Sequence, residues 1–104
     1  MEKERPIDRI KALAQWLIEH KVIKSMYAFE KVCNLSKRYV KNLSVTEKGN
    51  PSVEVVAQIY EVFPSLNLEW MVTGKGKMWK GNGTDDELAE SIRKQLLAIL
   101  MLRI

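Results

Sequence analysis

Apolar residues recur along most of the chain with the spacing of amphipathic helices. In the first such segment, Ile7–His20, they stand three and four positions apart, which places them on one helix face. The same spacing predicts shorter helices over Met26–Cys33, Lys37–Ser44 and Leu68–Thr73, and a wider apolar set predicts a central helix over Val53–Phe63. No stretch shows sustained apolar and polar alternation between hairpin turns. The pattern predicts an all-α fold with five helices in this part of the chain.

Residues at the ends of these segments agree with the predicted helices. A side-chain oxygen that can accept a first-turn amide stands before three of them, at Ser25, Ser36 and Asn67. Asn34, between the second and third helices, tolerates the left-handed backbone of a helix end. Pro64 stops the fourth helix and Gly74 ends the fifth. We therefore expect two short helices joined by a tight turn, followed by a longer helix and a short one.

The chain changes character after residue 80. Four of its five glycines lie between Gly74 and Gly83, without the spacing of a phosphate-binding loop, so this stretch is interpreted as turn and linker. Thr84 and three acidic residues then begin a sixth helix, Asp85–Leu102, whose carboxylates suit its positive end. We expect one domain over residues 1–80, and a linker with an extra amphipathic C-terminal helix over residues 81–104.

The sixth helix becomes apolar nearly all round from Leu96 to Leu102. A surface this apolar is expected to pack against another protein surface. Two partners are possible: a second copy of the chain, or the chain's own five-helix body, which the helix would reach through the glycine-rich hinge. We favour the homodimer, because an apolar helix on each copy can bury against its mate. The residues expected at this interface are Leu88, Ile92, Leu96, Ile99 and Leu100.

Charge narrows the class of function. The 104 residues carry 17 Lys and Arg against 13 Asp and Glu, a net charge of +4, which favours a polyanionic partner. Residues 21–48 hold seven of the cations and two of the anions, a net charge of +5, and the rest is nearly balanced. The longest apolar run has seven residues, where a membrane span needs about 20. Without an apolar signal segment at the N-terminus, we expect a cytoplasmic protein that does not contact membranes.

Few residues offer catalytic or metal-binding chemistry. The single cysteine, Cys33, and the single histidine, His20, make no disulfide, metal site or Cys/His pair. We expect Cys33 to be buried, His20 to lie at a helix end, and the tryptophans at positions 16, 70 and 79 to lie in or at the core. No carboxylate pair or nucleophile with an adjacent base presents itself. The sequence predicts a protein that is not an enzyme and uses no cofactor or metal.

Three motifs match a known pattern. They are Ala28–Ser36 followed by Tyr39-Val40, Asn50-Pro-Ser52, and Phe63-Pro-Ser-Leu-Asn-Leu-Glu-Trp-Met-Val-Thr-Gly-Lys-Gly76 with Met78. Together they resemble the lambda-repressor-like helix-turn-helix domain of phage-repressor and Cro-type transcription regulators, the Xre-like family. The resemblance covers about Ile7–Trp79, and its departure is Asn34, where the family usually has glycine.

The resemblance implies a five-helix DNA-binding domain whose third helix, within residues 36–44, lies in the DNA major groove. In such motifs the start of this helix reaches base edges. Val40 and Leu43 face the core, so the side chains of Lys37, Arg38 and Lys41 point away from it, and Asn42 lies along the same outward surface. Arg38 and Asn42 have the chemistry to pair with guanine and adenine. The residues expected to read bases are Ser36, Lys37, Arg38, Lys41 and Asn42.

A second set of residues flanks this helix and is expected beside the sugar-phosphate strands, namely Lys24, Ser25, Tyr39, Thr46, Lys48 and Asn50. Phosphate contacts position a protein on the duplex but carry little sequence information. Ser25 can serve both as N-cap and as phosphate contact. Two interpretations of Tyr39 stay open, a ring packed on the helix pair and a hydroxyl that reaches a phosphate.

The sequence thus predicts specific binding of double-stranded DNA by a homodimer, as a transcriptional repressor of phage or mobile-element type. Two alternatives remain. An antitoxin-type regulator would use the same fold and also bind a toxin protein. A protein-interaction module would keep the helix pair without binding DNA.

Overall fold

The structure is a computed structural model that describes residues 4–102, and within them regular secondary structure is helical. The helices are α1 (Pro6–Glu19), α2 (Met26–Val32), α3 (Tyr39–Ser44), α4 (Val53–Val62), α5 (Leu68–Thr73) and α6 (Asp85–Leu102). Across the described residues, the only strand-like pairing is an isolated antiparallel bridge between Leu66 and Trp79. The all-α prediction is confirmed. The same residues contain no helix with the length and hydropathy to cross a lipid bilayer.

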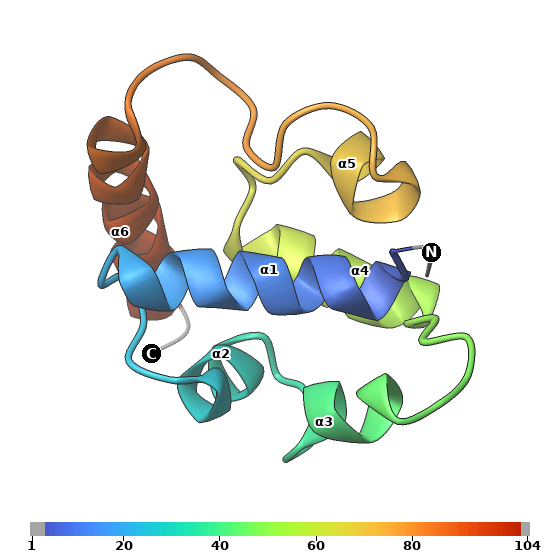
Figure 1. Ribbon diagram of the computed structural model, residues 1–104. Coiled ribbons are helices and arrows are strands. Elements are labelled where there is room, and N and C mark those ends of the chain that lie inside the picture. Colours follow the sequence, from blue (N-terminus) through green and yellow to red (C-terminus); the bar gives the residue numbers. More distant parts are fainter. Residues whose placement is uncertain (1–3, 103–104) are drawn as a thin grey trace.

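Helix α1 lies at the centre of the molecule. Figure 1 shows α2 and α3 on one side of α1, α5 with the loop after it on the other side, α4 behind, and α6 across the C-terminal end of α1. Five α1 residues at helical spacing are fully buried, Ile7, Ile10, Leu13, Ala14 and Leu17. They join the buried residues of the other helices in one continuous core. Burial of this apolar stripe is the main force that holds the short helices on α1.

An aromatic row crosses the core. Phe29 stacks on Phe63 with ring centroids 6.2 Å apart, Phe63 meets the edge of Trp79 at 6.5 Å, and Trp79 lies 5.1 Å from Trp16. Trp79 is buried, whereas Trp16 and Trp70 are half-buried. The tryptophans therefore pack as expected, and they tie the segment after α5 to the centre of the domain.

Side-chain caps stand before four of the helices, and those of Ser25 and Asn67 are where the sequence predicts them. Ser25, Ser52 and Asn67 each accept a hydrogen bond from a first-turn amide of the following helix, at 3.1, 3.2 and 3.1 Å. Thr84 and Glu87 form a reciprocal capping box at α6, because each side-chain oxygen accepts the other residue's backbone amide. These contacts set the starts of four of the helices.

Two arginine side chains, one buried and one half-buried, bind the C-terminal ends of the two shortest helices. The sequence did not predict these contacts. Helices α3 and α5 have six residues each, too few to be stable alone. Arg9, 5% exposed, donates to the last carbonyls of α5, those of Met71 and Val72, at 2.8 and 3.0 Å. Arg5 donates to the carbonyls of Ser44 and Thr46 at the end of α3, at 3.1 and 2.8 Å. Both cations thus satisfy carbonyls at the negative end of a helix dipole.

The glycine-rich segment is anchored over most of its length. Backbone bonds from Asn67 to the Met78 carbonyl, 2.9 Å, and from Lys80 to the Ser65 carbonyl, 2.8 Å, hold residues 78–80 beside the start of α5. Because Trp79 between them is buried, the chain up to residue 80 belongs to the body. The linker expected over the glycines is confined to the residues just before α6.

Helix α6 packs on its own chain. Ala89, Ile92 and Leu96 are buried, and Arg93 donates to the carbonyl of His20 at the end of α1, 3.2 Å away. Ile92 and Leu96, expected at a dimer interface, are therefore already covered without a second copy, because they face the core that α1 shares.

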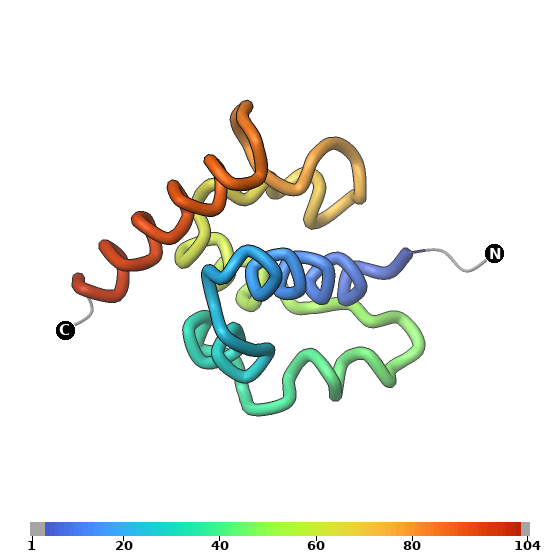
Figure 2. Tube along the Cα trace, turned by 60° about the vertical axis from the view of Figure 1, so that its left-hand side comes forward, coloured from blue at the N-terminus to red at the C-terminus, as the bar shows by residue number. Residues whose placement is uncertain are grey.

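The apolar surface left exposed on α6 lies at its end. Leu97, Leu100, Met101 and Leu102 expose between 37% and 87% of their surface. Figure 2 shows the last turns of α6 extending beyond the rest of the molecule. Of the other expected interface residues, Leu88 and Ile99 are half-buried. The apolar surface that α6 leaves open is thus at this end of the helix.

Candidate nucleic-acid interface

The turn between α2 and α3 has the geometry that its asparagine predicts. Asn34 has φ +59°, in the left-handed region. Its amide donates to the carbonyl of Lys31 at 3.1 Å, and the amide of Leu35 donates to that of Glu30 at 2.8 Å, the paired bonds of a Schellman helix end. Gln58 of α4 also donates to the Asn34 carbonyl, at 3.3 Å. The turn is therefore fixed from both sides, by its own helix and by α4.

The start of α3 differs from the prediction. The helix begins at Tyr39, not at Lys37, and the residue at its N-cap is Arg38, with φ +63°. Ser36 takes part through its backbone, since its carbonyl accepts the amide of Tyr39 at 3.1 Å. The prediction that the Ser36 side chain caps this helix is wrong. The reason is that another side chain accepts the hydrogen bonds of the first backbone amides of α3.

That side chain is Glu30, from the second half of α2. Its carboxylate is buried, with the residue 4% exposed, and its two oxygens accept the backbone amides of Arg38 and Val40 at 3.2 and 2.9 Å. A carboxylate in this place satisfies two orphan donors of α3 and lies at the positive end of its dipole.

The sequence held a signal that Glu30 is buried, although not of which amides it caps. Glu30 stands four residues after Met26 and three before Cys33, on the inward face of α2. A carboxylate in that position must find buried donors. A count of charges does not separate Glu30 from Glu47, the other anion of residues 21–48.

The residues expected to read bases lie in α3 and in the turn before it. Ser36, Lys37, Arg38, Lys41 and Asn42 are all exposed. Val40, on the opposite face, is 2% exposed and Leu43 is half-buried. Burial of these two residues turns the polar side of α3 outward, as the spacing predicts.

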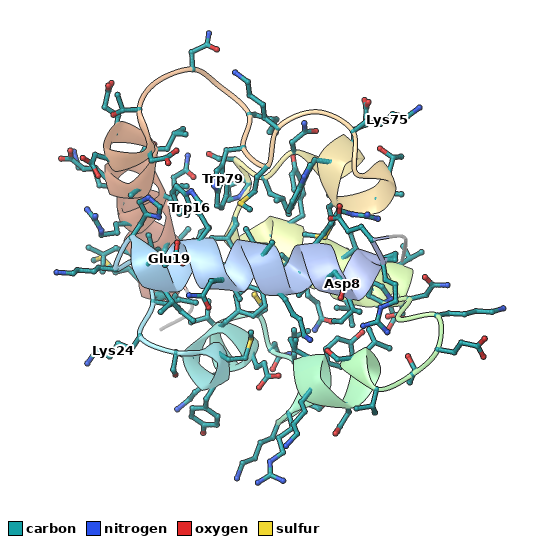
Figure 3. The ribbon with its side chains drawn as sticks, viewed as in Figure 1. Asp8, Trp16, Glu19, Lys24, Lys75 and Trp79 are labelled. Carbon is teal, nitrogen blue, oxygen red and sulfur yellow. The ribbon has the colours of Figure 1, made fainter. Side chains whose placement is uncertain are left out.

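Most residues expected beside phosphates are exposed as well. Figure 3 shows Lys24 just before α2, with its side chain directed away from the body. Ser25, Thr46, Lys48 and Asn50 are also exposed. The hydroxyl of Thr46 is engaged within the loop, because it donates to the Leu43 carbonyl at 2.6 Å and accepts the Gly49 amide at 3.1 Å. Thr46 therefore shapes the loop after α3.

Tyr39 is half-buried against the core. Burial raises the pKa of its phenol above the usual 10.0, and a hydrogen bond with the backbone of Ser52 acts in the opposite direction with a smaller effect. The ring thus packs where α3 meets the start of α4. Its hydroxyl stays protonated at neutral pH.

The exposed residues among 21–48 are more strongly cationic than the net charge counted from the sequence. All seven cations of residues 21–48 are exposed. Of the two anions, Glu30 is buried and holds backbone amides, which leaves Glu47 as the exposed one. The turn, α3 and the flanking loops therefore present a strongly cationic surface.

Within residues 4–102, no group of three or more His, Cys, Asp or Glu side chains lies close enough together to hold a metal ion. Cys33 is buried, as expected, and His20 is the C-cap of α1, where its Nδ1 lies 2.8 Å from the Trp16 carbonyl. Comparisons of the chain with protein-family models, with curated proteins and with solved structures find no match.

Proposed function

We propose that the protein binds double-stranded DNA in a sequence-specific way, with α2 and α3 as a helix-turn-helix and the start of α3 in the major groove. In this proposal it is a transcriptional repressor of phage or mobile-element type that acts on DNA in the cytoplasm. The five helices α1–α5 would form the lambda-repressor-like domain that the sequence motifs resemble.

The observation that carries the proposal is the exposed surface of the segment 36–42. Four side chains that can donate to base edges or phosphates, those of Lys37, Arg38, Lys41 and Asn42, are exposed there while Val40 is buried. Arginine pairs with guanine and asparagine with adenine through two hydrogen bonds each. A six-residue helix with this surface fits the groove that a helix enters.

The surrounding cations support a division of roles. Lys24 and Lys48 lie before α2 and after α3, so they flank the reading segment on both sides. Lysines in such places bind phosphates and set the position of the helix, whereas base contacts set the sequence preference. In this division, Arg38 and Asn42 read bases and Lys24 and Lys48 hold the backbone.

Selection of bound duplexes from a random pool tests the function directly. We expect a consensus sequence to emerge, with affinity for the consensus duplex at least about a thousandfold above that for a scrambled one. Recovery of no consensus, with weak binding that disappears at moderate salt, would leave only nonspecific attraction and refute the proposal. Absence of any duplex binding would instead favour a protein-interaction module.

Three alanine variants then test the division of roles. We expect Arg38→Ala to reduce selectivity at one base pair by about 5- to 150-fold. Lys48→Ala should weaken binding to all duplexes alike and reduce the salt slope by about one unit. Lys75→Ala is the matched control, an exposed lysine that Figure 3 places near α5, on the other side of α1. Identical behaviour of the first two variants would contradict the division.

We also propose that two copies bind together, because repressors of this type occupy two half-sites about one helical turn apart. The end of α6, with Leu97 and Leu100, is the apolar surface available for the contact. A symmetric consensus and a dimer in sedimentation would support this arrangement. A stable monomer at about 100 μM with an asymmetric consensus would remove it.

A further inference from the structure

We propose that Glu30 is a positioning residue for the reading surface: its buried carboxylate holds the left-handed backbone of Arg38 and the first turn of α3. The inference rests on the proposed DNA binding. It adds that sequence preference depends on a residue that never touches the duplex.

Helix α3 needs support from outside. It has six residues, and its N-cap residue, Arg38, makes no side-chain hydrogen bond to the helix. The first amides of such a helix have no partner within it. Glu30 accepts two of them, from Arg38 and Val40, across the turn between the helices. The start of α3 is therefore set by a contact from α2.

The backbone at Arg38 also requires this contact. At φ +63°, Arg38 occupies a region that residues other than glycine, asparagine and aspartate rarely adopt. The Cα–Cβ direction of a residue follows from its backbone, so this conformation decides where the Arg38 side chain leaves the surface. The bond from the Arg38 amide to Glu30, 3.2 Å, fixes that direction.

Position matters more for base contacts than for phosphate contacts. A bidentate pair with a base edge needs both hydrogen bonds in register, whereas a lysine follows a phosphate with a flexible side chain. Loss of the Glu30 contact should therefore reduce selectivity while leaving nonspecific attraction in place. A residue with a merely structural role would lower the folded fraction and weaken both kinds of binding equally.

The variant Glu30→Gln tests this prediction. Glutamine has nearly the same shape but only one acceptor oxygen, and its amide group opposes one of the two backbone donors. Glu47→Gln is the matched control, because it removes the same charge from the exposed loop after α3. Both variants raise the net charge by one unit and strengthen attraction to any duplex alike.

Affinity is measured for the consensus and the scrambled duplex at one salt concentration, under conditions where circular dichroism shows each variant folded. We expect the affinity ratio to fall at least about tenfold in Glu30→Gln and to stay within about twofold in Glu47→Gln. An unchanged ratio in Glu30→Gln, together with a reduced ratio in Arg38→Ala, would overturn the positioning role and leave the proposed function standing. A wild-type protein without selectivity would overturn both.

A second measurement covers the case in which Glu30→Gln does not fold. Hydrogen exchange of the wild-type protein, followed by NMR, reports on the Val40 amide itself. We expect slow exchange there, comparable to amides in the middle of α1, because the bond to the Glu30 carboxylate is 2.9 Å and buried. Rapid exchange at Val40 in the folded protein would show that the carboxylate does not hold α3, and would overturn the proposal.

Discussion

Truncation of Ile92 in α6 tests how the last helix is covered. Ile92 is 1% exposed within a single chain, where it belongs to the same core as the buried residues of α1. The change Ile92→Ala removes three carbon groups, worth about 2.4 kcal/mol in lost transfer free energy at about 0.8 kcal/mol each. A partly collapsed cavity adds to this, so we expect a loss of about 3 kcal/mol in the free energy of unfolding.

The matched control lies one and a half turns further along the same helix. Leu97 is 61% exposed. Leu97→Ala should therefore change the free energy of unfolding by less than about 0.5 kcal/mol in the monomer. Helix propensity cannot account for the expected contrast, because alanine is a stronger helix former than isoleucine and would by itself favour the Ile92→Ala variant.

Urea unfolding followed by circular dichroism measures both variants. With a slope near 2 kcal/mol/M, the Ile92→Ala midpoint should fall by about 1.5 M. Comparable losses for the two variants would refute the packing of α6 on its own chain.

Three further predictions concern other parts of the fold. Lys21 has φ +59° at the end of α1, so Lys21→Gly should raise stability by about 0.5–1 kcal/mol, and a lower melting temperature would contradict this. At Gly49, with φ +56°, an added Cβ would lie 2.6 Å from Cγ2 of Ile7. Gly49→Ala should therefore lower the free energy of unfolding by about 2 kcal/mol or more, measured by urea unfolding. An unchanged midpoint would count against the close approach. Hydrogen bonds from Arg5 hold the pKa of Asp8 below its ordinary 3.8. Because this pKa is lower in the folded state, the ionised carboxylate stabilises the protein above about pH 4 and loses that effect as the pH falls below it. The free energy of unfolding should therefore fall less in Asp8→Asn than in the wild type between about pH 6 and pH 3.

Local features of the fold could be predicted because their causes lie within a few residues. A serine or asparagine before a helix bonds an amide two or three positions later, which is why Ser25 and Asn67 identified helix starts. The left-handed Asn34 follows from its own side chain and position. Apolar spacing set the remaining bounds to within one residue, with α3 as the exception.

Features that depend on distant partners could not be predicted in this way. Glu30 caps α3 across ten residues, Arg5 ends α3 across 41, and Arg9 ends α5 across 62. No periodicity links such pairs, since each depends on how the helices cross. The same holds for α6, where apolar spacing showed that a face is buried but not what covers it.

The motifs that carry the family resemblance and the residues proposed to read DNA obey different constraints. Leu66 is fully buried, Asn67 caps α5, and Gly74 takes a left-handed backbone at the end of that helix. Packing and backbone geometry therefore constrain these residues. Lys37 and Asn42 are exposed, and no packing requirement selects them. In the proposed function, the preferred duplex therefore depends on side chains that the fold leaves open to change. Selection from a random pool is the experiment that would identify it.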